Sequence, residues 1–215
     1  MMAQPLPFAE WPEHLQFLGR FLRSPRTIGA IAPSSRWLAR AMAANLANPV
    51  SRANPVRVVE LGPGTGAFTR EIVERLGPAD RFLCVEIEPA FIESLRRRWP
   101  EVECVCASAE SLPTLVGERQ LGPIDHMVSG LPFASLPTET TRGILDSVGR
   151  TLRPGGTFTT FQYVHSYGLP PAIVFRRGMN TLMGSTPSVR FVARNLPPAF
   201  ALSWTNRRAA VARSH

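Results

Sequence analysis

Lysine is absent from the 215-residue sequence, so arginine supplies all 24 basic residues against 16 acidic ones, for a net charge of +8. Codon bias alone could produce this composition. Arginine side chains also bind phosphate groups through paired hydrogen bonds. The positive charge therefore favours an anionic partner, either a nucleic acid or an acidic membrane face, without choosing between them.

Cysteine is scarce, with three residues at Cys84, Cys104 and Cys106 and no Cys-x-x-Cys pair. This excludes a disulfide framework and a cysteine-based zinc site, and no metal is expected. Cys104 and Cys106 alternate in a short apolar stretch, as buried thiols of a strand would, which indicates a cytoplasmic protein.

Long apolar runs are also missing. A bilayer-spanning helix needs roughly 20 apolar residues, and no stretch reaches that length. Glu10 and Glu13 interrupt the N-terminal region, which therefore lacks the features of a signal peptide. The length and the 44% hydrophobic content suit one compact domain.

Two helices are expected before the main domain. Residues 10–23 place Trp11, Leu15, Leu18 and Leu22 on one face, with Phe21 beside them. A second helix should run from Ser34 or Ser35 to about Leu46, and residues 48–55 read as a linker. We therefore divide the chain into an N-terminal helical extension, 1–48, and a main domain, 49–215.

Strands and helices alternate from residue 56 onwards. Strands are expected at 56–61, 81–87, 102–106, 124–129, 157–164, 188–194 and 200–205. Helices are expected at 67–76, 89–98, 138–151 and 171–183. This alternation predicts an α/β fold with a parallel sheet covered by helices on both faces.

The strongest motif is Glu60-Leu61-Gly62-Pro63-Gly64-Thr65-Gly66, where the first strand turns into a helix. Dinucleotide enzymes use G-x-G-x-x-G to seat a pyrophosphate. Here the glycines alternate, and the acid before them would repel a pyrophosphate. Such an acid suits S-adenosylmethionine, which carries an amine and a sulfonium.

A second acid, Glu86, ends the next strand. It lies about 20 residues beyond the glycines, the offset at which a carboxylate accepts hydrogen bonds from ribose hydroxyls. A plain strand-to-helix turn would explain the glycines but not the two acids.

These residues resemble the class I methyltransferases over roughly residues 56–165. The resemblance implies a Rossmann-like seven-stranded sheet of order 3-2-1-4-5-7-6 with strand 7 antiparallel. It also implies S-adenosylmethionine as cofactor, S-adenosylhomocysteine as product, and an adenine contact from Ser108 or Glu110. The cofactor residues expected on this basis are Glu60, Gly62, Gly64, Thr65, Gly66, Glu86, Ile87, Ser108, Ala109, Glu110 and Ser129.

The expected acceptor loop, Ser129-Gly130-Leu131-Pro132-Phe133, follows the fourth strand, where a substrate should bind. Methyltransferases acting on adenine amines begin a similar loop with Asn or Asp and end it with an aromatic residue. Ser129 replaces that Asn and Phe133 replaces the usual Tyr. Serine has a shorter reach than Asn, which argues against the amine of a planar base as acceptor and for a different kind of amine.

Three segments resemble the bacterial phospholipid N-methyltransferases, which convert phosphatidylethanolamine to phosphatidylcholine: 21–35, 129–132 and 194–200. The resemblance implies a peripheral enzyme on the inner face of the cell membrane, with the first helix at the interface. The predicted substrate or membrane residues are Trp11, Leu15, Leu18, Arg20, Phe21, Arg23, Arg26, Ser34, Ser35, Tyr167, Arg190 and Asn195, and Arg176, Arg177 and Arg194 would extend the basic face. An ordinary packed helix remains the alternative for 10–23.

Methyl transfer to such a head group needs a neutral amine, so a proton must leave. His165 has a suitable reference pKa, although a histidine there could equally lie in a surface loop. Phe133, Tyr163 and Tyr167 could form an aromatic cage for a methylated ammonium. The predicted catalytic residues are Ser129, Leu131, Phe133, Tyr163 and His165.

Three alternatives stay open: an adenine-dimethylating ribosomal RNA methyltransferase, an N-methyltransferase of another amino lipid such as an ornithine lipid, and a non-catalytic cofactor-binding scaffold. We expect no nucleic-acid partner, because no basic stripe interleaved with aromatic residues occurs. No obligate protein partner is evident either.

Overall fold

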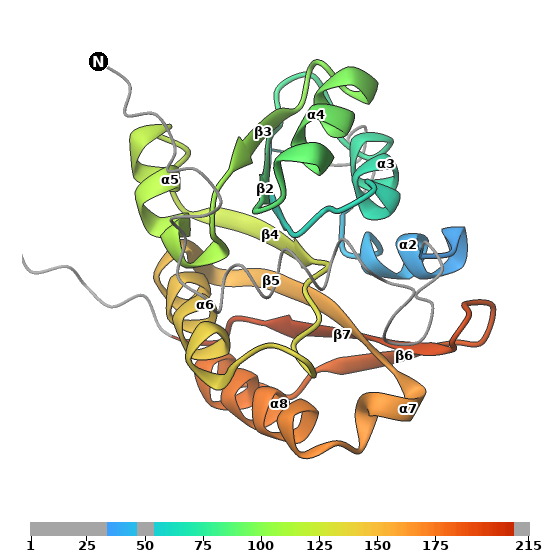
Figure 1. Ribbon diagram of the computed structural model, residues 1–215. Helices are drawn as coiled ribbons and strands as arrows, with labels where there is room; N and C mark the ends of the chain where they lie inside the picture. Colours follow the sequence, from blue (N-terminus) through green and yellow to red (C-terminus); the bar gives the residue numbers. More distant parts are fainter. Residues whose placement is uncertain (1–33, 47–53, 209–215) are drawn as a thin grey trace, which may run out of the picture.

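The computed structural model describes residues 34–46 and 54–208, and its centre is a seven-stranded sheet (Figure 1). The strands are β1 (Arg57–Leu61), β2 (Arg81–Glu86), β3 (Glu103–Cys106), β4 (Ile124–Ser129), β5 (Leu152–Tyr163), β6 (Ser188–Val192) and β7 (Ala199–Thr205). They lie in the order β3-β2-β1-β4-β5-β7-β6, which confirms the expected order. β1 to β5 pair in parallel, and β7 runs antiparallel to both β5 and β6.

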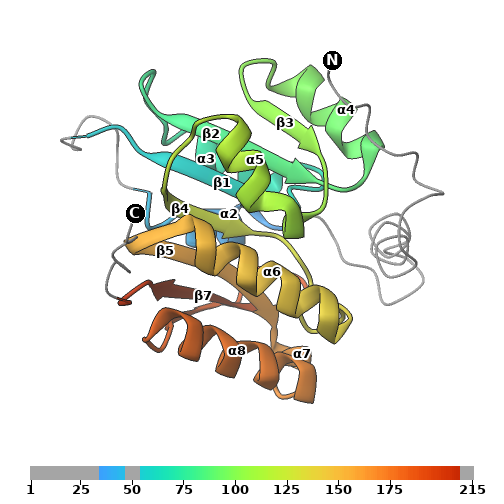
Figure 2. The same cartoon turned by 90° about the vertical axis from the view of Figure 1, so that its left-hand side faces the viewer.

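Helices cover both faces of the sheet, as predicted (Figures 1 and 2). The helices on one face are α2 (Arg36–Met42), α3 (Ala67–Val73) and α4 (Pro89–Arg98), and those on the other are α5 (Leu112–Glu118), α6 (Thr138–Thr151) and α8 (Pro170–Met183). Alternate residues of each strand point to opposite faces. In β1, Val59 and Leu61 therefore join the core under α5 and α6, whereas Val58 packs with α2 and α3.

The larger core lies under α6 and α8. Phe158 and Trp204 are fully buried there, and Phe175 of α8 packs edge-on to Trp204. The Trp204 indole donates to Asn180 Oδ1 at 2.8 Å, so its buried N–H is satisfied.

Several element boundaries differ from those expected. β5 begins at Leu152 instead of residue 157, because an irregularity in its pairing with β4 lets five earlier residues join the strand. β6 ends at Val192, before the β6–β7 hairpin. Three short elements carry no motif and were not predicted: a 3-10 turn, η3 (Ala109–Ser111), helix α5, and α7 (Val164–Tyr167).

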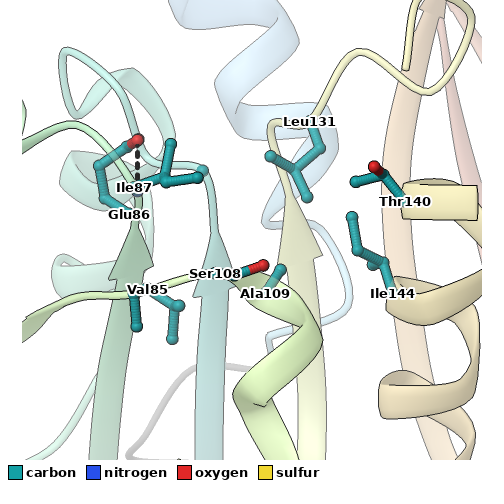
Figure 3. A pocket seen from close by; sticks show the side chains of 10 residues that line it. Val85, Glu86, Ile87, Ser108, Ala109, Leu131, Thr140 and Ile144 are labelled. Atoms are coloured by element: carbon teal, nitrogen blue, oxygen red, sulfur yellow. Dashed lines mark hydrogen bonds between the residues drawn. The ribbon is translucent and has the colours of Figure 1, made fainter. Parts of the chain in front are cut away.

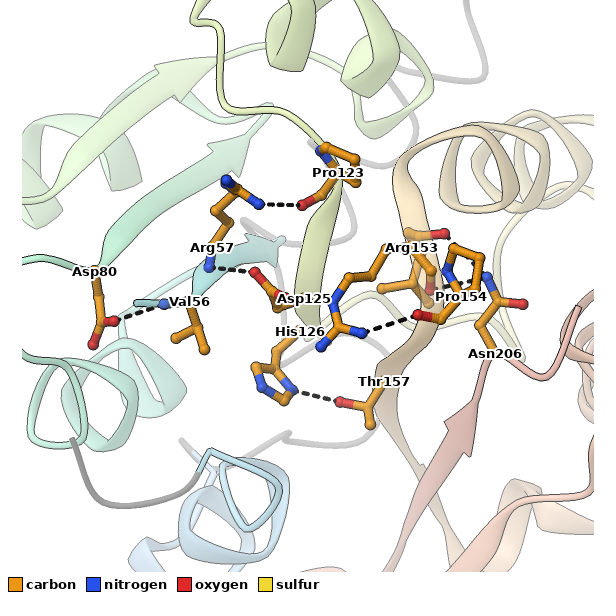
Figure 4. Close-up of polar contacts among 11 residues, drawn as sticks. Val56, Arg57, Asp80, Pro123, Asp125, His126, Arg153, Pro154, Thr157 and Asn206 are labelled. Carbon is orange, nitrogen blue, oxygen red and sulfur yellow. Dashed lines mark hydrogen bonds and ion pairs between the residues drawn. The ribbon is translucent and has the colours of Figure 1, made fainter. Parts of the chain in front are cut away.

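Polar side chains fasten the amino ends of the strands, at the edge opposite the glycine loop (Figure 4). Asp125 accepts from the Arg57 backbone N–H at 2.8 Å and pairs with Arg153. Asp80 accepts from the Val56 N–H at 2.8 Å, and Asn206 donates to the Leu152 carbonyl at 3.0 Å. These bonds join β1 to β4 and β4 to β5, and they join the segments before β2 and after β7 to the same edge of the sheet.

The first described helix belongs to the region assigned to the N-terminal extension. Ser35 caps α2 by accepting from the Leu38 N–H at 3.2 Å, and Leu38 is buried in the core. The expected helix 10–23 lies outside the described residues, with Trp11, Leu15, Leu18, Arg20, Phe21, Arg23 and Arg26. The proposed boundary near residue 48 stays a prediction.

All three cysteines are free, with Cys84 and Cys104 buried and Cys106 half-buried. In the described ranges, no group of side chains could hold a metal ion. None of the helices described here is both long enough and apolar enough to cross a bilayer.

Asn195 fastens the β6–β7 hairpin to α2 across 160 positions of the chain. Its Oδ1 accepts from the Ser35 N–H at 2.9 Å, and its Nδ2 donates to the Pro197 carbonyl at 2.7 Å. Asn195 is buried, whereas the next residue, Leu196, is 77% exposed.

We expect Asn195→Ala to lower the free energy of unfolding by about 1–3 kcal/mol, because it leaves two part-buried backbone groups without their partner. Urea denaturation followed by circular dichroism measures this. Leu196→Ala is the matched control and should change stability little. Equal effects of the two substitutions would contradict the anchoring role.

Candidate functional site

The glycine loop that follows β1 is held by backbone bonds from both neighbouring strands. Gly62 N–H donates to the Val85 carbonyl at 2.9 Å, and Gly130 N–H donates to the Leu61 carbonyl at 2.8 Å. The loop turns through positive φ angles, and at Gly66, with φ +80°, a Cβ would lie 2.5 Å from the Trp99 ring. Glycine is required at that position on both counts.

Glu86 at the end of β2 closes against the same loop. Its Oε2 accepts from the Gly64 N–H at 3.0 Å, and its Oε1 accepts from the Ile87 and Glu88 N–H groups at 2.8 and 3.0 Å. Burial raises the pKa of this carboxyl, and the three backbone donors oppose the rise. A carboxylate has about four acceptor positions, so one position on Oε2 remains for a ligand hydroxyl.

Glu60 is fully buried on the opposite face of β1, towards α3 and α4. Its Oε2 accepts from Thr69 Oγ1 at 2.7 Å, and the Cys84 thiol lies 3.6 Å away. Its Oε1 is buried with no hydrogen-bond partner in the described part of the chain. Desolvation by burial raises the pKa of Glu60 to about 8. An unpaired buried carboxyl oxygen of this kind suits a ligand ammonium.

A narrow cavity lies between the glycine loop, β2, β3 and α6 (Figure 3). Its walls are mostly apolar, with polar atoms from Glu86, Ser108 and Thr140. The residues that line it are Gly62, Val85, Glu86, Ile87, Ala107, Ser108, Ala109, Leu131, Thr140 and Ile144. The cavity measures about 10 Å³ in this structure, so a nucleoside would have to widen it. Its apolar walls, carboxylate and two hydroxyls are the groups that suit the flat faces, the diol and the polar base edge of a nucleoside.

The predicted cofactor residues fall into two groups. Gly62, Glu86, Ile87, Ser108 and Ala109 line this nucleoside cavity, and so does Leu131 of the acceptor loop. Among the described residues, the lining set does not include Glu60, Gly64, Thr65, Gly66, Glu110 or Ser129. The cofactor roles of these six residues stay predictions.

Ser108 caps the start of η3 by bonding to Glu110, so the two residues are not equivalent candidates for a contact with adenine. Ser108 Oγ accepts from the Glu110 N–H at 3.2 Å and donates to Glu110 Oε2 at 3.1 Å. The Glu110 side chain packs against Gly143 of α6, where any Cβ would collide with its carboxylate. Ser108 therefore faces the cavity, and Glu110 bridges η3 to α6.

Thr140 is a cavity residue that sequence reasoning missed. It is 1% exposed, and its Oγ1 has no hydrogen-bond partner within the described ranges. It reaches the cavity from the first turn of α6 (Figure 3). No motif marks it, because a single threonine after a loop has no distinctive spacing.

Ser129 and Phe133 of the acceptor loop are both buried. Ser129 Oγ accepts from the Leu131 N–H at 3.3 Å, and its carbonyl accepts from Thr160 Oγ1 at 3.1 Å. Phe133 is 3% exposed and stacks on Phe175 with ring centroids 4.1 Å apart. The Phe133 ring is thus part of the core under α8.

Tyr163 and His165 lie at the end of an aromatic row formed by Phe68, Phe161, Tyr163 and His165. Successive ring centroids are 5.7, 5.2 and 5.6 Å apart. The Phe68 ring also packs beside Gly130 of the acceptor loop. Burial raises the pKa of Tyr163 to about 12, and its buried hydroxyl has no partner in the described region. His165 is exposed.

The other predicted substrate residues gather around the hairpin. Tyr167 packs against Phe200, and the Arg176 guanidinium lies 3.8 Å above its ring. Arg176 also donates to Gln162 Oε1 at 2.6 Å, so it is part of the internal packing. Arg190 and Arg177 are exposed, and Ser35 and Asn195 are brought together as described above.

Comparison with known proteins gives three findings. Residues 58–156 match the family model described as methyltransferase domain. The ornithine lipid N-methyltransferase of Singulisphaera acidiphila is 34% identical over 188 residues, covering 86% of this chain and 92% of that protein. The ribosomal RNA small subunit methyltransferase A of Mycoplasmoides gallisepticum is 29% identical over 89 residues, only 41% of this chain and 32% of that protein.

Solved structures show the same fold. The 1,6-didemethyltoxoflavin-N1-methyltransferase of Burkholderia thailandensis, solved with S-adenosylhomocysteine, superposes with a TM-score of 0.62 at 18% identity. The match covers 97% of this chain and 94% of that one.

We expect Glu60→Gln to flatten the dependence of stability on pH. The neutral carboxyl is favoured in the folded protein, so stability is full below the ordinary pKa of 4.5 and falls until the pH passes about 8. In that window, wild type should lose about 1.4 kcal/mol per pH unit relative to the variant. Chemical denaturation across the pH range measures the difference, and parallel curves would contradict the raised pKa.

We expect Thr140→Val to weaken binding of S-adenosylhomocysteine about three- to tenfold, since one hydrogen bond contributes about 0.5–1.5 kcal/mol. Isothermal titration calorimetry measures this. Thr141→Val is the matched control: the Thr141 hydroxyl is also buried without a partner in the described chain, but it does not line the cavity. If both variants bind equally, Thr140 has no contact with the ligand.

Proposed function

We propose that this chain, which belongs to the class I S-adenosylmethionine-dependent methyltransferases, methylates the amine head group of a membrane lipid. The fold and the cofactor follow from family membership. The cavity lining offers the Glu86 carboxylate for the ribose and the Thr140 hydroxyl for the base. The unpaired Glu60 oxygen lies outside that lining, buried on the opposite face of β1. When bound, S-adenosylmethionine supplies an electrophilic methyl group.

The observation that carries the proposal is the extent of similarity to the ornithine lipid enzyme. It covers 86% of this chain, so it includes residues well outside the cofactor domain. The similarity to the ribosomal RNA enzyme covers less than half of the chain. A match restricted to the cofactor region says little about the acceptor, whereas a match along the chain supports a shared acceptor class.

The acceptor loop also disfavours a nucleobase. An enzyme that methylates adenine stacks an aromatic side chain on the base. Here the ring in the corresponding position, Phe133, is buried and already stacks on Phe175, so it has no free face for a base. An RNA base could not reach it without rearrangement of the core under α8.

Buried surroundings would help to keep an acceptor amine neutral, since a charged ammonium is disfavoured away from water. Ser129 is fully buried, and its Oγ accepts from the Leu131 N–H, so it would orient the amine hydrogens only after the acceptor loop moves. The row that begins at Phe68 beside Gly130 ends at the exposed His165. Phenyl rings carry no exchangeable proton, so the released proton would have to reach His165 through water.

Contact with a membrane is supported by exposed apolar side chains beside the hairpin. This hairpin patch comprises Val164, Val189, Phe191 and Leu196, all at least 43% exposed. The Val164 N–H donates to the Pro198 carbonyl at 2.9 Å, which places α7 against the hairpin. Exposed apolar residues beside exposed arginines suit the interface of an anionic membrane.

Two amino lipids are the leading acceptors. The relative's activity favours an ornithine lipid, and the sequence segments that resemble phospholipid N-methyltransferases favour phosphatidylethanolamine. Both present a primary amine close to an anionic group, so the head-group chemistry alone does not separate them.

Incubation with methyl-labelled cofactor and vesicles that contain one amino lipid at a time will identify the acceptor. We expect label in the lipid extract with ornithine lipid or phosphatidylethanolamine, and none in ribosomal RNA. Glu86→Gln should abolish labelling, because its amide cannot accept from the Gly64 N–H in the same way. Label confined to RNA, or no label with any amino lipid, would refute the proposal.

A further inference from the structure

A second cavity lies on the other side of the glycine loop, between α2, α3 and α4. It has a volume of about 350 Å³, and it is lined by Ser34, Arg36, Ala39, Thr65, Gly66, Ala67, Arg70, Glu71 and Arg98. It shares no lining residue with the nucleoside cavity. The two cavities therefore flank opposite ends of one loop, with Gly62 on one side and Thr65 and Gly66 on the other.

Three arginines from three helices converge on this cavity, which we call the arginine cleft (Arg36, Arg70 and Arg98). All three are exposed, and none forms an ion pair within residues 34–46 and 54–208. Arg98 donates to the Thr65 carbonyl at 2.6 Å. The guanidinium groups of Arg36 and Arg70 donate no hydrogen bond to any residue in the described structure.

The acid in the lining does not cancel this charge. Glu71 is buried, and its carboxylate already pairs with Arg75 at 2.7 Å and with Arg40 at 3.5 Å. The cleft therefore keeps an excess of positive charge, together with the hydroxyls of Ser34 and Thr65. Guanidinium forks and hydroxyls at this density suit the oxygens of a phosphate group.

The positive charge continues from the cleft towards the hairpin patch. Three guanidinium groups lie over the Trp37 ring, with their carbons 4.9 Å (Arg36), 4.9 Å (Arg194) and 5.8 Å (Arg40) from the ring centroid. The bond from Ser35 to Asn195 holds the start of α2 against the hairpin. A surface that touches apolar membrane through the hairpin patch would thus bring the cleft to the level of lipid phosphates.

We propose that the arginine cleft binds the phosphate group of an anionic membrane lipid, separately from the lipid that is methylated. This inference rests on the proposed action at a membrane. The occupant is a phosphodiester presented by a bilayer, since α2, which contributes Arg36 to the cleft, is bonded to the hairpin that carries the exposed apolar residues.

The test uses the full-length protein without cofactor, so its outcome does not depend on methyl transfer. Sedimentation with vesicles of phosphatidylcholine alone, and with phosphatidylglycerol added, measures partition at low and at high salt. The variant is Arg36→Gln/Arg70→Gln, which spares the bond from Arg98 to Thr65. The control is Arg81→Gln/Arg150→Gln, which removes the same charge from exposed positions outside the cleft.

We expect the cleft variant to lose about fivefold in partition for each arginine removed, from the roughly 1 kcal/mol that an arginine contributes near an anionic surface. The control should lose much less, and binding of S-adenosylhomocysteine should be unchanged in both. Tight binding of inorganic phosphate, with no effect on vesicle partition, would overturn the assignment to a lipid. Equal losses in both double variants would show general charge attraction and would also overturn it.

A third outcome would assign the cleft to another ligand. If the cleft variant loses affinity for S-adenosylhomocysteine while its vesicle partition is retained, the arginines serve the carboxylate of the cofactor, and the proposal is wrong. If no amino lipid is labelled but vesicle partition still depends on the cleft arginines, the proposed acceptor is wrong and the lipid-phosphate site is supported.

Discussion

The hydrogen bond from the Gly64 N–H to the Glu86 carboxylate is the contact on which the site depends. It fixes a loop of positive-φ glycines against the end of β2, and the Gly62 and Gly130 backbone bonds fix the start of the same loop between β2 and the end of β4. Because the loop is held from both sides, Gly62 stays beside Leu131, where a Cβ would lie 2.6 Å from that side chain. The nucleoside cavity exists only while this spacing is kept.

The two acids that the glycine motif requires have different electrostatic roles. Glu86 is anchored by three backbone donors, which favour its ionised form against the effect of burial. Glu60 has side-chain partners on one oxygen only, and burial raises its pKa to about 8. A ligand cation near Glu60 would replace the missing partner and favour the carboxylate. The protein therefore gives up some stability at neutral pH to keep a carboxyl ready for a cation.

Local motifs predicted the parts of the site that one segment of chain forms by itself. The glycine loop and Glu86 follow from short patterns, and the strand order follows from the resemblance to the class I methyltransferases. Thr140 and the bond from Ser35 to Asn195 could not be predicted, because they depend on how α6 and the β6–β7 hairpin dock on the sheet. Phe133 shows the converse. Its place in the acceptor loop predicts a substrate contact, but its ring packs in the core because α8 places Phe175 against it.

The short glycine loop also explains how a cofactor and a membrane could meet at one edge of the sheet. Gly62 lines the apolar cavity, and Thr65 and Gly66, only a few residues later, line the arginine cleft. Arg98 holds the Thr65 carbonyl on the second side as Glu86 holds the Gly64 N–H on the first. A ligand that moves the side chain of Glu86 or Arg98 would therefore shift the adjacent peptide groups of Gly64 and Thr65. If a phosphate in the cleft shifts this loop, it changes the affinity of the cavity for a nucleoside. Because coupling between two sites is reciprocal in free energy, a nucleoside in the cavity then changes the affinity of the cleft for phosphate by the same factor.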